Sequence, residues 1–179
     1  MRSLSEVKFV ACTHDEHAQE ILSIFNEAIA NSTALYDYHP RTSQNMEGWF
    51  AAKAAGGFPV IGAVDEDGVL LGFASYGTFR AWPAYKYSVE HSVYVHKDHR
   101  GQGLGPVLME KLIEAARAQQ LHVMIGVIDA ANKGSIALHE RLSFAHAGTV
   151  RQAGFKFGQW LDVAFYQLIL ETPTHPVDG

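Results

Sequence analysis

The residues of this chain whose types could support catalysis are concentrated in one stretch, Glu90–Gly105. Glu90 lies in a run of alternating apolar and polar residues, and a carboxylate in the middle of such a strand needs a partner or a function. One explanation is a buried hydrogen bond or an ion pair with Arg80 or Lys86. The other is a general base, with a pKa raised by partial burial, that accepts a proton directly or through water.

The same stretch ends in a glycine-rich loop, Arg100-Gly-Gln-Gly-Leu-Gly, and apolar residues recur at helical spacing from Leu104 onward. Glycines let the backbone approach a ligand closely, and the first N–H groups of a helix have no intrahelical partners. The loop is one residue short of the dinucleotide-binding motif, Pro106 stands at the last glycine position, and no P-loop run is present. It suits a phosphate or pyrophosphate, with a flexible turn that binds nothing as the alternative.

The pattern Arg100-x-x-Gly103-x-Gly105 resembles the Arg/Gln-x-x-Gly-x-Gly/Ala signature of the GCN5-related N-acetyltransferases (GNAT). Further segments resemble one branch of that superfamily, the phosphinothricin / methionine sulfoximine acetyltransferases. These segments are Val89–Val95, His122–Met124, Asn132 with Ser135–His139, and Lys156–Asp162. The similarity covers roughly residues 7 to 170, which makes it far more specific than the loop alone.

This resemblance implies an enzyme that transfers an acetyl group from acetyl-CoA to the α-amine of a small amino acid, by direct attack on the thioester and without a metal ion. The usual acceptors of the branch are phosphinothricin, methionine sulfoximine and methionine sulfone. The implied catalytic residue is Glu90. The residues implied to contact the acceptor are Arg80, Ala81, Trp82, Glu90, His91 and Ser92. The residues implied to hold acetyl-CoA are Val93, Tyr94, Val95, Arg100, Gly101, Gln102, Gly103, Leu104, Gly105, Pro106 and Asn132.

Several of these positions have structural alternatives. Arg80 could be a surface charge, His91 could be a buried core histidine, and Asn132 could be the N-cap of a helix. His139 departs from the superfamily pattern, because many GNAT enzymes carry there a tyrosine that protonates the departing thiolate. The sequence does not decide whether His139 takes that role.

The elements that must position these residues follow from hydrophobic periodicity. Strands are predicted at residues 7–12, 59–64, 69–76, 89–95, 121–128, 145–150 and 161–170, with a glycine-rich excursion through Phe155 and Trp160 between the last two. Helices are predicted after a Thr13-x-x-Glu16 capping box and at residues 42–55, 104–119 and 132–142. The predicted fold is α/β, specifically the GNAT fold: a mixed, mostly antiparallel twisted sheet of about seven strands with about four flanking helices.

Composition narrows the setting. The chain has 179 residues, of which 47 % are hydrophobic and 18 % charged, which predicts one domain over residues 1–170 with a loose tail at 171–179. A net charge of −5 without a basic run argues against nucleic acid, and no apolar run is long enough for a membrane span. The single cysteine, Cys12, favours a cytoplasmic location. The family resemblance implies that the protein forms a homodimer.

Two other functions remain open from the sequence. One is acetylation of a different amine, such as a polyamine, an aminoglycoside or a protein N-terminus. The other is a non-catalytic sensor that binds acyl-CoA, which the absence of the usual tyrosine at position 139 makes worth testing.

Overall fold

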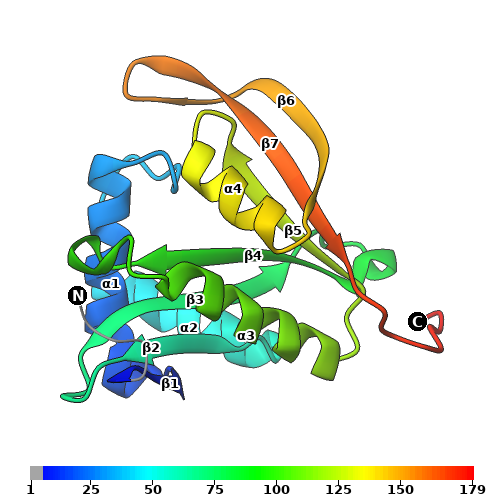
Figure 1. Ribbon diagram of the computed structural model, residues 1–179, viewed down its shortest axis with the longest axis horizontal. Coiled ribbons are helices and arrows are strands. Elements are labelled where there is room, and N and C mark those ends of the chain that lie inside the picture. The colour runs from blue at the N-terminus through cyan, green and yellow to red at the C-terminus, as the bar shows by residue number, and fades with distance from the viewer. Residues whose placement is uncertain (1–5) are drawn as a thin grey trace. The chain divides into compact units, whose positions relative to one another are not determined.

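The structure, a computed structural model, describes residues 6–179 (Figure 1). Within them seven strands form a sheet with the order β1-β2-β3-β4-β5-β7-β6. The strands are β1 (Lys8–Ala11), β2 (Val60–Val64), β3 (Leu70–Thr78), β4 (Ser88–Val95), β5 (Val123–Asp129), β6 (Ala145–Lys156) and β7 (Gln159–Ile169). The α-helices are α1 (His14–Asn31), α2 (Ser43–Gly56), α3 (Leu104–Ala118) and α4 (Lys133–Arg141). The pair β4–β5 is parallel, whereas β1–β2, β2–β3, β5–β7 and β6–β7 are antiparallel. The predicted fold class is confirmed.

The described chain divides into two compact units. The first unit contains residues 6–76 and Ser92–Leu112, and the second contains Gly77–His91 and Ile113–Gly179. The division falls within β4 and within α3. The prediction of a single domain over residues 1–170 depends on whether these two units act together, and it stays a prediction.

The core of the first unit forms where the apolar stripe of α1 meets α2 and the strands β2 and β3. The stripe includes Ile21 and Phe25, whose exposed fractions are 0 % and 2 %, and it packs with Met46 of α2 and Phe73 of β3. Burial of such side chains from water is the main favourable contribution to folding. The helical period predicted for α1 is therefore confirmed.

The N-terminus of α1 differs from its prediction in one detail. The Thr13 hydroxyl accepts a hydrogen bond from the backbone N–H of Glu16, at 3.3 Å, as a capping box requires. In a full capping box the Thr13 N–H would donate to the side chain of Glu16. Here it donates instead to Nδ1 of His17, at 3.1 Å. The full capping box belongs instead to α2, where Thr42 and Asn45 exchange both bonds.

The sheet of the first unit consists of β1, the β2–β3 hairpin and the end of β4. Asp65 accepts hydrogen bonds from the N–H groups of Asp67 and Val69 in the hairpin turn. Gly72 of β3 has no room for a side chain, because an added Cβ would lie 2.8 Å from the Tyr94 carbonyl oxygen. The backbone of β4 thus passes close against β3, which fixes the position of the Tyr94 peptide.

In the second unit the β6–β7 hairpin takes the place of the glycine-rich excursion that was predicted between two shorter strands (Figure 1). β6 continues to Lys156 and β7 begins at Gln159, so Phe155 and Trp160 are paired strand residues with ring centroids 5.1 Å apart. The prediction was wrong because it took the glycines of this segment to mark a loop. Gly158, at φ +74°, lies in the two-residue turn, and Gly154 borders an irregularity in the strand pairing.

The C-terminal segment after β7 makes specific contacts within the second unit. The backbone N–H of Val177 donates to the Tyr87 hydroxyl, at 3.1 Å. The Thr172 carbonyl accepts a hydrogen bond from Nδ1 of His122, at 2.6 Å. The loose tail predicted at 171–179 stays a prediction.

Candidate active site

The glycine-rich loop lies in the first unit, between the end of β4 and the start of α3 at Leu104. Gly101 and Gly103 have φ values of +74° and +83°, a backbone conformation that favours glycine. A Cβ added at Gly101 would meet no atom within 4 Å. Open space therefore lies beside a helix N-terminus, whose first N–H groups have no partner within the helix. This arrangement fits an anionic group such as a pyrophosphate.

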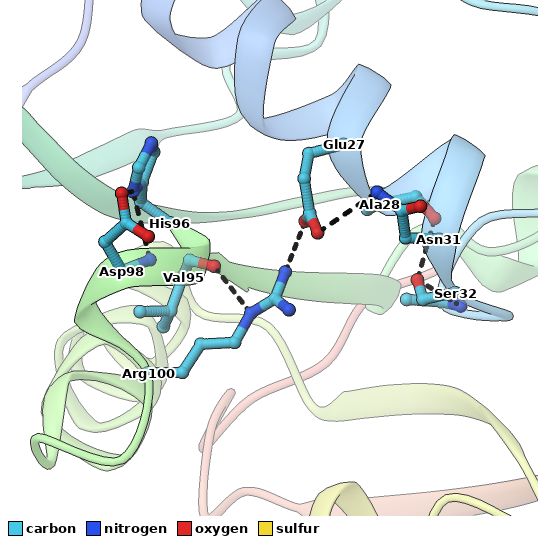
Figure 2. Close-up of polar contacts among 9 residues, drawn as sticks. Glu27, Ala28, Asn31, Ser32, Val95, His96, Asp98 and Arg100 are labelled. Carbon is cyan, nitrogen blue, oxygen red and sulfur yellow. Dashed lines mark hydrogen bonds and ion pairs between the residues drawn. The ribbon is translucent and has the colours of Figure 1, made fainter.

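Arg100 anchors this loop to the rest of the first unit (Figure 2). Its Nε donates to the Val95 carbonyl oxygen, at 3.2 Å, and its guanidinium forms an ion pair with Glu27 of α1. Figure 2 shows the guanidinium between these two partners. Arg100 therefore ties the end of β4 to α1. Glu27 was not predicted from the sequence, since a glutamate on the polar side of an amphipathic helix gives no signal of a long-range partner.

The peptide groups of Val93–Val95 belong to the part of β4 in the first unit. The parallel pairing of β4 with β5 covers the preceding residues and ends with the pair His91–Gly126. The Tyr94 ring packs on the rings of Phe25 and Phe73, at centroid distances of 5.2 and 5.5 Å. Its side chain thus contributes to the core, while its backbone lies at the end of the central strand.

Glu90 lies half-buried on β4 in the second unit. Burial raises the pKa of its carboxyl above the ordinary value, and the positive charge of Arg80 opposes that shift. No ion pair joins Glu90 to Arg80 or Lys86 in the described chain; the Arg80 guanidinium lies over the Phe79 ring, at 4.8 Å. A carboxylate with a raised pKa is a stronger base near neutral pH, as general-base catalysis requires.

The other residues expected to contact the acceptor are Ala81, Trp82 and Ser92, and all three are exposed. Trp82 has an exposed fraction of 75 %. Exposed aromatic side chains of this size are available to bind a ligand or a partner. Their roles stay a prediction.

His91 is buried in the second unit against His139 of α4. Nδ1 of His139 donates to the Ser135 carbonyl, at 2.7 Å, so its Nε2 accepts from Nε2–H of His91, at 2.9 Å. Nδ1 of His91 has no hydrogen-bond partner in the described chain. Gly126 leaves room for the pair, because a Cβ there would lie 2.9 Å from Nε2 of His139. These surroundings match the alternative of a buried core histidine for His91.

Both imidazoles are neutral near neutral pH. Burial and the neighbouring His139 lower the pKa of His91 to about 3, and burial lowers the pKa of His139. The single N–H of neutral His139 is committed to the Ser135 carbonyl. His139 in this arrangement therefore holds no spare proton to give to a leaving group.

The histidine pair leads to a prediction about acid stability. Because the folded pKa of His91 lies below the ordinary 6.5, the unfolded chain binds a proton first as the pH falls. The pair's contribution to stability is then full above pH 6.5 and is lost progressively as the pH falls through 3, by about 5 kcal/mol in total. Urea unfolding at pH 7, 5 and 4 should show a shallower pH dependence in His91→Gln than in the unmodified protein.

A matched control separates this effect from general acid unfolding. His175→Gln alters an exposed histidine of the C-terminal segment and should leave the pH dependence unchanged. An equal slope in His91→Gln and His175→Gln would contradict the prediction.

Asn132 is the N-cap of α4, the alternative considered from the sequence. Its Oδ1 accepts a hydrogen bond from the Ser135 N–H, at 3.1 Å. This bond satisfies one of the otherwise unpaired N–H groups of the first turn. The Nδ2 group has no partner among residues 6–179, so the N-cap role leaves it available for a ligand.

Comparisons with known proteins show what the whole chain is similar to. Residues 19–144 match the acetyltransferase (GNAT) family. The chain is 48 % identical to the L-methionine sulfoximine/L-methionine sulfone acetyltransferase of Pseudomonas aeruginosa PAO1, over 84 % of this chain and 88 % of that protein.

Solved structures give the same result. An acetyltransferase structure from Acinetobacter baylyi ADP1 superposes with a TM-score of 0.96 at 62 % identity, covering 97 % of both chains. A phosphinothricin acetyltransferase from Sinorhizobium meliloti, in complex with acetyl-CoA, gives a TM-score of 0.90 at 33 % identity, covering 96 % of this chain and 92 % of the other. Within residues 6–179, no helix has both the length and the apolar character that a membrane span requires.

Proposed function

The chain belongs to the acetyltransferase (GNAT) family, and we propose that it transfers an acetyl group from acetyl-CoA to the α-amine of small amino acids. The proposed acceptors are methionine sulfoximine, methionine sulfone and phosphinothricin, which the names of its relatives specify. Among the observations from the structure, the half-buried Glu90, with its raised pKa and without an ion-pair partner, carries the proposal. It is a group able to take a proton from an amino-acid ammonium.

Three sets of groups would hold acetyl-CoA. The loop Arg100–Pro106 would receive the pyrophosphate, which the open space at Gly101 and the start of α3 support. The backbone groups of Val93–Val95 would pair with the extended pantetheine arm, which is supported by the end of β4–β5 pairing at His91. The free Nδ2 group of Asn132 would add one hydrogen bond. When bound, acetyl-CoA supplies the acetyl thioester.

Glu90 then acts on the acceptor. Its carboxylate takes a proton from the α-ammonium, directly or through water, and thereby frees the nitrogen lone pair for attack on the thioester carbonyl. Arg80 supplies a positive charge that acts on Glu90 in the second unit, and its guanidinium suits the acceptor carboxylate. The proton for the departing thiolate comes from another group or from water, since the only N–H of His139 is committed.

The family resemblance is the basis for what we propose about domain organisation, oligomeric state, location and metal requirement. We expect the two units to act as one domain, the protein to work as a homodimer in the cytoplasm, and the reaction to need no metal. Gel filtration with light scattering measures the oligomeric state, and activity after dialysis against a chelator measures the need for a metal.

Thiol release with a panel of acceptors tests the proposed function. We expect release of coenzyme A with methionine sulfone, methionine sulfoximine and phosphinothricin, and little release with their α-N-methylated or carboxamide forms. Turnover with polyamines, aminoglycosides or peptides but with no amino acid would contradict the proposal. Binding of acetyl-CoA without turnover of any amine would identify a sensor.

A further inference from the structure

A small hollow in the first unit, called here the Lys53 hollow, opens among residues of α1, α2, β3 and β4. Its volume is about 100 Å³, the space of about three water molecules. Four aromatic rings, among them Phe25 and Trp49, contribute to its wall, together with the side chains of Arg41, Lys53, Ser75 and Ser92. The hollow can therefore take one small polar group of a ligand.

The polar lining of the Lys53 hollow is rich in hydrogen-bond donors. Arg41, Lys53 and the indole of Trp49 carry donors only, and no Asp or Glu is among the described residues that line the hollow. Arg41 is paired with Asp37, at 3.2 Å, whereas no ion pair joins Lys53 to a carboxylate in the part of the chain that the structure describes. The hollow therefore has a net positive charge.

The Lys53 ammonium is held in place. Its Nζ donates to the Tyr76 carbonyl oxygen, at 2.8 Å, and lies 5.2 Å from the centroid of the Trp49 ring. An ammonium has three N–H bonds, so two remain for a ligand. Burial lowers the pKa of Lys53 to about 8, which leaves the group protonated at neutral pH but poorly solvated. Oxygen acceptors bind strongly to such a charged donor.

We propose that Lys53 is a specificity-determining residue whose ammonium donates hydrogen bonds to oxygen atoms at the end of the acceptor side chain. Sulfone, sulfoximine and phosphinyl groups have such oxygens and are of a size that the hollow can take. The inference rests on the proposed function. Ser92 links the hollow to that function, because it lines the hollow and follows the proposed base Glu90 by two residues on β4. The positive charge disfavours cationic acceptors such as polyamines.

The test compares methionine sulfone with methionine, which differ only in two sulfur-bound oxygens. In the unmodified enzyme, kcat/KM should favour the sulfone. In Lys53→Met, which keeps the length of the side chain, the sulfone should lose about tenfold or more in kcat/KM while methionine changes little. The loss should appear mainly in KM. Lys53→Arg, which keeps the charge and the donors, should restore most of the preference for the sulfone.

Lys111→Met is the matched control, because Lys111 is also a partly exposed lysine near an aromatic ring, that of Phe9, at 4.9 Å, but does not line the hollow. Lys111→Met should leave kcat/KM unchanged for both methionine sulfone and methionine. An unchanged ratio in Lys53→Met, or an equal loss for both amino acids, would overturn the inference, the latter by indicating a structural role. Failure of the proposed function has a different signature: the unmodified enzyme would release no thiol with either amino acid.

Discussion

Glu90→Gln is expected to lower kcat by about a hundredfold or more, the usual contribution of a general base. Glutamine keeps the size of the side chain and much of its hydrogen bonding, but it cannot take a proton from the acceptor ammonium. Glu90 lies half-buried on β4, and this burial raises the pKa of its carboxyl. Steady-state kinetics with methionine sulfone at saturating acetyl-CoA measures the change.

The pH dependence distinguishes a base from a positioning group. Because Glu90 must be ionised to accept a proton, the activity of the unmodified enzyme should fall as the pH drops through its raised pKa. Glu90→Gln should lose that acidic limb and regain part of its activity at high pH, where more of the acceptor amine is already neutral. The exposed Glu110 of α3 provides the control, and Glu110→Gln should keep the normal profile. An unchanged kcat in Glu90→Gln would exclude the base assignment, and an equal loss at every pH would favour positioning.

The fold could be predicted from the sequence wherever one periodicity dominates a segment. The stripe of α1 around Phe25 and the turn at Asp67-Gly68 have local signals, and both are as predicted. The β6–β7 hairpin was mispredicted because glycine permits both loops and strand irregularities. Only the pairing across the hairpin, Phe155 with Trp160, distinguishes the two, and the local sequence does not contain it.

The site was predictable in part for the same reason. Contiguous features, such as the glycine loop and the N-cap at Asn132, carry their signal in neighbouring residues. Contacts between distant segments do not. The ion pair of Arg100 with Glu27 and the hydrogen bond of His91 with His139 join residues that no local pattern relates. Lys53 likewise looks like an ordinary helix residue until the fold places its ammonium against the Tyr76 carbonyl.

Gly103→Glu is expected to lower the affinity for acetyl-CoA by at least about a hundredfold, or about 3 kcal/mol of binding free energy, while the protein stays folded. The added carboxylate would enter the space proposed for an anionic pyrophosphate and would repel it.

Backbone strain is a competing cause of lost affinity in Gly103→Glu, since Gly103 has a φ of +83°. Gly68→Glu controls for the effect of such strain on folding, because Gly68 has the same φ of +83° in the hairpin turn, where an added Cβ meets nothing within 4 Å. Calorimetric titration with acetyl-CoA should find normal affinity in Gly68→Glu and none measurable in Gly103→Glu, with circular dichroism confirming that both variants are folded. Unchanged affinity in folded Gly103→Glu would show that the loop does not bind the pyrophosphate.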